Sequence, residues 1–196
     1  TRSSSALVLS MGLGCSRAIG LGDVTGYKIT DRVVVNRYTS RVIIYPGAPG
    51  GMLGPPITIQ TSAPPGLLRS VVLADLDNDG DLDINALSSP GGVYPLENDG
   101  SGSFGPFGQN PPTTTYGVDA RSAVASDFNL DGFVDLYKLS ASGEGRLLIG
   151  DGAGGFFDGA SNTLPSGAGN PILGDFDGDG LDDVITVNFG HDTAAY

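Results

Sequence analysis

One acidic pattern recurs three times along the chain, at intervals of about fifty residues. Each copy is nine residues long and has Asp or Asn at positions 1, 3, 5 and 9, with glycine at position 6. Glycine at that point allows a tight turn without a Cβ clash, so the oxygen side chains can converge on one point. The three copies are Asp75–Asp83, Asp127–Asp135 and Asp175–Asp183.

Converging carboxylate and amide oxygens are the ligands that calcium takes in proteins, whereas magnesium retains more of its water. Zinc would prefer His or Cys, of which the chain has one each. A solvated turn is the alternative reading, but a turn gains nothing from crowding carboxylates that repel each other. The sequence therefore predicts three Ca²⁺ sites, in which position 7 contributes its backbone carbonyl. The predicted ligands are Asp75, Asp77, Asp79, Asp81 and Asp83; Asp127, Asn129, Asp131, Phe133 and Asp135; and Asp175, Asp177, Asp179, Leu181 and Asp183, with Asp81, Phe133 and Leu181 acting through their carbonyls.

The first half of this pattern also occurs in the EF-hand, which requires a bidentate Glu at position 12. The corresponding residues here are Ala86, Lys138 and Thr186, so the EF-hand reading fails. A short β-prone run follows each loop and an apolar run precedes it. The loops are therefore expected to connect strands.

A fourth copy of the pattern is degenerate. Counting 52 residues back from Asp75 reaches Asp23, eight residues before Asp31, but Tyr27 occupies position 5 and Lys28 replaces the turn glycine. This loop is not expected to hold calcium. Either the Lys28 ammonium partly substitutes for the ion, or the loop has drifted.

A glycine-rich turn ending in a large apolar residue follows about 23 residues after the start of a loop. Each turn comes after a strand-like run. The repeat thus reads as four strands in roughly fifty residues, which is the size of one propeller blade. The turns are Asn98–Phe104, Gly150–Phe156 and, more loosely, Gly47–Leu53.

An arginine stands six residues before three of the loops, as Arg17, Arg69 and Arg121, and Gly169 takes this place in the last repeat. Six strand residues span about 20 Å, so these arginines are expected at the far end of the strand from the loops. They could form a basic ring for an acidic ligand or bond to neighbouring blades, and the second role is favoured.

The loop and the later glycine turn resemble the FG-GAP/VCBS repeats of integrin α-chain propellers and of many secreted bacterial and fungal proteins. The resemblance covers nearly the whole chain and implies calcium ligation by the loop residues at positions 1, 3, 5 and 9, but no catalytic residue. The expected fold is all-β: a β-propeller of four-stranded blades, with about four repeats of about 50 residues, as part of a larger propeller. A single repeat domain over 1–196 would hold units 17–68 (degenerate), 69–120, 121–168 and 169–196 (incomplete), with 1–16 as the fourth strand of a preceding blade.

The net charge of −12 excludes an ordinary nucleic-acid binder, because no basic stripe is present to neutralise phosphates. No membrane span is expected. A protein with several calcium loops and no sensor helices is best placed where calcium is plentiful, so the chain is predicted to be secreted or at the cell surface. The single cysteine, Cys15, agrees weakly with that placement.

Three functions are considered. The leading hypothesis is a calcium-stabilised module that binds a protein or glycan in adhesion or extracellular assembly, through variable stretches that include the candidate contact residues Tyr94 and Tyr116. The second is a purely architectural module of a filament or surface protein. The third is the propeller domain of a polysaccharide-acting enzyme, but His191 is the only histidine and no catalytic constellation is suggested, so no enzymatic activity is expected. The variable stretches are Pro46–Pro56, Ser88–Tyr94, Gln109–Tyr116 and Ser161–Gly169.

Overall fold

The computed structural model describes residues 16–107, 120–167, 169–188 and 193–195, and these form an all-β structure. The only helical element among them is the single 3₁₀ turn η1 (Pro49–Gly51). None of these residues belongs to a helix long and apolar enough to cross a membrane. The predicted all-β class is therefore confirmed.

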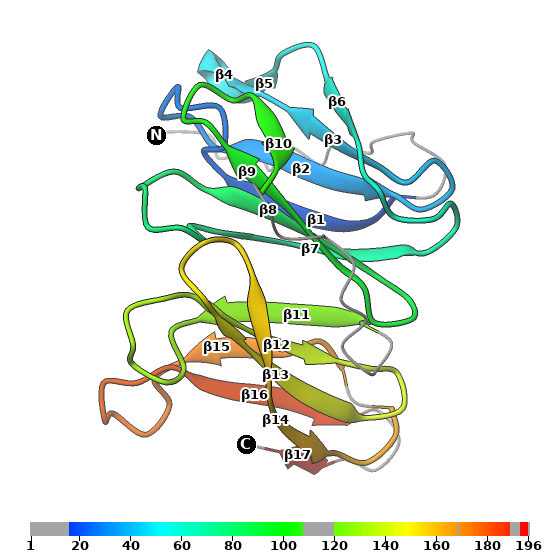
Figure 1. Ribbon diagram of the computed structural model, residues 1–196, viewed down its shortest axis with the longest axis vertical. Coiled ribbons are helices and arrows are strands. Elements are labelled where there is room, and N and C mark those ends of the chain that lie inside the picture. Colours follow the sequence, from blue (N-terminus) through cyan, green and yellow to red (C-terminus); the bar gives the residue numbers. More distant parts are fainter. Residues whose placement is uncertain (1–15, 108–119, 168, 189–192, 196) are drawn as a thin grey trace, which may run out of the picture.

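Three four-stranded antiparallel sheets and a smaller fourth one follow each other along the chain (Figure 1). The first sheet contains β1 (Ser16–Gly22), β2 (Asp31–Asn36), β3 (Arg41–Tyr45) and β6 (Ile57–Gln60). The second contains β7 (Leu68–Ala74), β8 (Asp83–Ser88), β9 (Val93–Asn98) and β10 (Phe104–Pro106). The third contains β11 (Ser122–Ser126), β12 (Asp135–Leu139), β13 (Glu144–Gly150) and β14 (Phe156–Thr163). The fourth contains β15 (Ile172–Gly174), β16 (Asp183–Asn188) and β17 (Thr193–Ala195).

The predicted four-strand unit matches the sheets, except in the first repeat. There the glycine-rich segment expected as a hairpin forms a separate two-stranded sheet of β4 (Gly47–Ala48) and β5 (Met52–Leu53) around η1. This segment carries no copy of the tight turn seen at 98–104, so the chain makes a longer excursion before β6 returns to pair with β3. The strand expected within residues 1–16 lies outside the described residues, apart from Ser16.

Adjacent sheets pack through apolar side chains, and the first strands β1, β7 and β11 lie next to one another in the stack (Figure 1). One core joins the first and second sheets, with Val33 and Ile44 packed in the same cluster as Leu68 and Ile84. A second core joins the next pair of sheets through Leu87, Val93, Leu136 and Leu148. Burial of such side chains contributes about 1.5–3 kcal/mol each, so the interfaces between sheets supply most of the stability.

Lys138 is a charged side chain that crosses between two sheets. It belongs to β12, is fully buried, and donates from Nζ to the Gly91 carbonyl (3.1 Å) in the turn between β8 and β9. Burial, aided by repulsion from Arg146, lowers the pKa of Lys138 from 10.5 to about 8. The folded protein therefore releases this proton at a lower pH than the unfolded chain does.

We expect this lysine to make the protein more stable as the pH rises from about 8 towards 10. Over that window the unfolded chain binds more protons than the folded one, so the free energy of unfolding increases with pH. Denaturant unfolding at several pH values measures the slope. Lys138→Met should flatten it, and an unchanged slope in that variant would contradict the assignment.

Candidate metal centres

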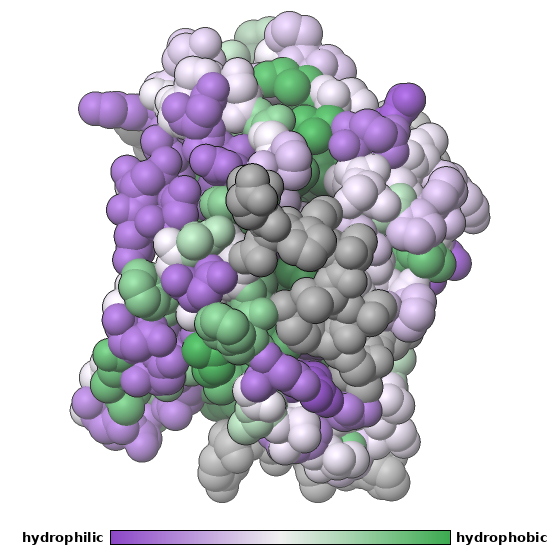
Figure 2. Space-filling model, viewed as in Figure 1, coloured by the Kyte–Doolittle hydropathy of each residue, from purple (hydrophilic) through white to green (hydrophobic). Residues whose placement is uncertain are grey.

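Each acidic loop joins the first strand of a sheet to the second, and the loops lie along one edge of the stack, at the left in Figure 1. Figure 2 shows that much of this edge is hydrophilic. The turn glycines at position 6 have φ of 96° (Gly80), 90° (Gly132) and 88° (Gly180). These values lie in the left-handed region that favours glycine, as the sequence predicted.

Position 4 also has a positive φ in every loop, which the sequence analysis missed. The residues are Gly26 (74°), Asn78 (61°), Leu130 (61°) and Gly178 (82°). Glycine or asparagine at three of these four positions is the signal that could have revealed it, because both tolerate the left-handed conformation.

Leu130 is the exception, and we predict that Leu130→Asn stabilises the protein. A leucine in this conformation costs about 1–2 kcal/mol, and its side chain is 66 % exposed, so little packing would be lost. A gain of about 1 kcal/mol corresponds to a rise of about 2–4 °C in Tm for a protein of this size. Thermal unfolding measures it. The matched control is Leu181→Asn, also on an exposed loop leucine but without a positive φ, which should give no such gain.

Backbone N–H groups fold each loop around its own carboxylates. The position 1 aspartate accepts from the N–H of position 6: Gly80 to Asp75 Oδ2 (3.0 Å) and Gly180 to Asp175 Oδ2 (3.0 Å). The loop between them does the same, from Gly132 to Asp127 Oδ2 (2.9 Å). The position 5 aspartates accept instead from the N–H of position 7, at 2.8–2.9 Å, through Asp79, Asp131 and Asp179.

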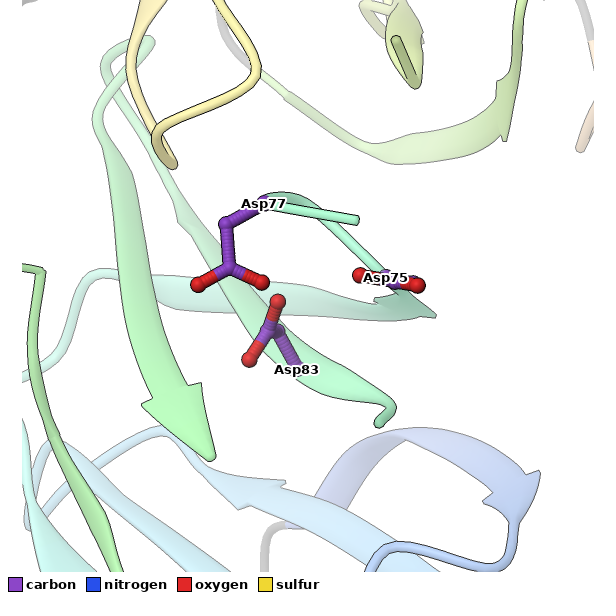
Figure 3. Close-up of side chains that lie close together, drawn as sticks. All are labelled: Asp75, Asp77 and Asp83. Carbon is purple, nitrogen blue, oxygen red and sulfur yellow. The ribbon is translucent and has the colours of Figure 1, made fainter. Parts of the chain in front are cut away.

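Two of the loops bring three carboxylates together. Oxygen atoms of Asp75, Asp77 and Asp83 lie within 4.8 Å of one another, and those of Asp175, Asp177 and Asp183 do the same. Figure 3 shows the carboxylates of Asp77 and Asp83 facing each other, with Asp75 beside them at the end of β7. Three clustered carboxylates and no nitrogen or sulfur donor fit a hard divalent cation such as calcium.

The remaining predicted ligands lie differently. The acidic side chains of loop 127–135 do not form such a cluster among the described residues, and Asn129 Nδ2 donates to Asp131 Oδ2 (2.8 Å). Asp79 and Asp179 lie outside the two clusters and hold the turn as described above. Ligation through the carbonyls of Asp81, Phe133 and Leu181 stays a prediction.

Burial and crowding raise the pKa values of two carboxyls in the first cluster, Asp83 and Asp77. Burial raises the pKa of Asp83 to about 6, with added repulsion from Asp77 and Asp79, although the N–H groups of Asn98 and Leu76 oppose the shift. Burial also raises the pKa of Asp77, and repulsion from Asp79 adds to this. A bound divalent cation would offset both the repulsion and the loss of hydration.

The position 9 aspartates have a second role that the sequence analysis did not identify. Asp83 accepts from the N–H of Leu76 (2.8 Å) and of Asn98 (2.8 Å), which joins its loop to the end of β9. Asp135 makes the equivalent pair with Phe128 (3.0 Å) and Gly150 (2.9 Å). Each of these carboxylates therefore holds three strands of a sheet together through backbone hydrogen bonds, independently of any metal.

The degenerate loop keeps this arrangement. Asp31 is fully buried and accepts from Val24 N (2.9 Å), from Thr25 N and Oγ1 (2.9 Å each) and from Gly47 N (2.7 Å). Lys28 takes the place of the turn glycine at φ 58°, and its N–H donates to Asp23 Oδ2 (2.6 Å). The Lys28 side chain is exposed and forms no ion pair with the aspartates among the described residues, so the structure does not support its substituting for an ion.

The glycine-rich turns pack against position 7 of their own loops. A Cβ on Gly152 would strike the ring of Phe133, and one on Gly100 would lie 2.5 Å from Asp81 Oδ2. Asn98, at the start of the second turn, donates to the carbonyls of Leu82 (3.0 Å) and of Val24 (3.1 Å) in the preceding sheet. The turns therefore help to fix the loops, which explains their regular spacing.

Two of the proposed contact features are wrong. Tyr94 is only 6 % exposed and packs in the core of β9, and most of Ser88–Tyr94 is buried with it. Val93 and Tyr94 already belong to β9 and pack in the cores between the sheets, so they are not part of a variable surface loop. The stretch Gln109–Tyr116 lies entirely outside the described residues, as do Cys15 and His191.

A comparison with protein families identifies one segment of the chain. Residues 127–186 match a family model described as an FG-GAP-like repeat. The matched segment begins at the first aspartate of loop 127–135 and continues through β12, β13 and β14, then β15 and loop 175–183, into β16. The matched segment therefore contains two of the acidic loops and the glycine-rich turn between them. No curated protein matches the chain.

Proposed function

We propose that the chain is a calcium-stabilised β-propeller module, secreted or exposed at the cell surface, which binds a protein or glycan partner in adhesion or extracellular assembly. The two clusters of three carboxylates at equivalent places on one edge carry the calcium part of this proposal. The same loop positions form both clusters, in the second and fourth sheets, as expected if each ion stabilises the sheet to which its loop belongs. The proposal assigns the chain no catalytic role.

The stacking of the sheets supports the propeller. Consecutive four-stranded sheets pack with their first strands side by side, as blades do around an axis. In β1, the residues Gly20 and Gly22 face the second sheet, whereas Ile19 (55 % exposed) and Leu21 (63 % exposed) alternate with them. In the last sheet Ile172 and Val187 are also about half exposed. Apolar residues on both outer faces are expected where further blades pack.

The three loops should differ in calcium affinity. Loop 127–135 has the neutral Asn129 in place of one carboxylate and does not gather its acidic groups, so it should bind most weakly. We expect calorimetric titration of chelator-stripped protein to show two tighter sites and one weaker site.

Variants assign these sites. Asp77→Asn should remove one tight site and Asp177→Asn the other, whereas Asp99→Asn, on an exposed turn outside the loops, should leave all sites in place. Binding that is equal in all three variants would exclude the acidic loops as the calcium ligands.

A glycan array probed with and without calcium tests whether the partner is a glycan. Concentration-dependent assembly without any ligand would instead favour the architectural role.

A further inference from the structure

A pocket of about 470 Å³ lies where the first strands of all four sheets begin. Its lining includes Ala18 from β1, Ser70 from β7, Ser122 from β11 and Asn170, just before β15. These four residues occupy the same place in successive repeats, since each stands five positions before the first aspartate of its loop. The pocket is thus a product of the repeat itself, formed where equivalent positions converge.

The pocket is separate from the metal centres. Five strand residues span about 17 Å, so it lies at the other end of the first strands from the acidic loops. A volume of this size falls in the range of small-molecule sites, about 300–1,000 Å³. The pocket is therefore large enough for a ligand of the size of a monosaccharide.

The lining is basic, although the chain as a whole is strongly acidic. Arg69 and Arg121 both line it, and none of its lining residues within the described part of the chain is acidic, although the chain has a net charge of −12. Arg69 Nη1 is held by the carbonyls of Gly66 (2.9 Å) and Leu68 (3.2 Å), which fixes the position of its guanidinium. Arg121 is exposed and has no ion-pair partner among the residues that the structure describes. Arg17 is equivalent to both, but its side chain lies outside the described part.

We propose that this pocket binds a small carboxylate that also carries hydroxyl groups, of the class of a uronic acid. A guanidinium binds a planar carboxylate through two parallel hydrogen bonds, which Arg121 is placed to offer. The exposed amide of Asn170 then serves the ligand's hydroxyl groups. This proposal rests on the partner-binding part of the proposed function, for which it names a ligand. It does not depend on the calcium part, because none of the predicted calcium ligands lines the pocket.

Titration of the calcium-loaded protein with D-glucuronate, followed by NMR chemical-shift changes, tests the proposal. We expect saturable binding that weakens with added salt, and no binding of D-glucose at the same concentrations. N-acetylglutamate distinguishes the source of the carboxylate. If it binds and glucuronate does not, the uronic-acid class is overturned in favour of an acidic peptide side chain.

Variants locate the binding. Arg121→Gln should weaken glucuronate binding by about tenfold or more, because a hydrogen-bonded charge is lost. Arg41→Gln removes the same charge from an exposed position on β3 that does not line the pocket, and it should leave binding unchanged. Equal affinity in both variants, or no binding by the intact protein, overturns the pocket. The calcium titration is a separate measurement. A failure to bind glucuronate would not contradict the calcium sites, and a failure to bind calcium would not contradict the pocket.

Discussion

Replacing Asp31 with alanine should lower the free energy of unfolding by about 3 kcal/mol or more, both with and without calcium. The carboxylate is fully buried and accepts four hydrogen bonds, and each buried donor left without a partner costs about 1–3 kcal/mol. The total loss should be smaller than the four penalties added together. The alanine variant no longer has to bury a charge away from water, and water can reach some of the donors that are left. Thermal unfolding should show a fall in Tm of about 6–12 °C.

Two comparisons make this result specific. Asp31→Asn keeps one acceptor oxygen in place and should fall between the wild type and the alanine variant. A loss of stability that disappears in chelator would mean that loop 23–31 holds calcium after all. A loss below about 1 kcal/mol would contradict the view that the position 9 aspartate holds the strands together.

Calcium should raise the stability of the chelator-stripped protein by several kcal/mol. At a free calcium concentration 100 times the Kd, each site contributes about 2.7 kcal/mol, so the two clustered sites together contribute about 5 kcal/mol. This corresponds to a rise in Tm of about 10–20 °C. The physical reason is that the clustered carboxylates repel one another in the folded protein and a cation removes this repulsion.

Magnesium at the same concentration is the control for the ion, and it should stabilise much less, because it needs a tighter octahedral geometry and gives up its water reluctantly. Asp77→Asn and Asp177→Asn should each remove about half of the calcium-dependent increment. The same Tm in calcium and in chelator would refute the metal centres, even though the folded loops would remain.

The local features of this fold can be predicted from the residues themselves. The acidic pattern predicts tight turns at Gly80, Gly132 and Gly180, the β-prone runs predict strands on either side of each loop, and the structure has both. These predictions hold because a turn depends on residues within a few positions of one another, and because short alternating runs have few other ways to bury their apolar side chains. The spacing of the loops likewise predicted the four-stranded sheets.

Contacts between residues far apart in the chain could not be predicted in this way. In the sequence, Asp31 and Asp83 are simply the last residues of their loops. In the structure, each accepts a hydrogen bond from a backbone N–H far along the chain and so holds strands together. Asp31 does this although its loop is not expected to hold calcium. Tyr94 reads as a surface aromatic but packs in the core. The pocket at Arg69 and Arg121 forms because four sheets, about fifty residues apart in the chain, begin at one place. Such convergence is set by how sheets pack, which no short stretch of sequence records.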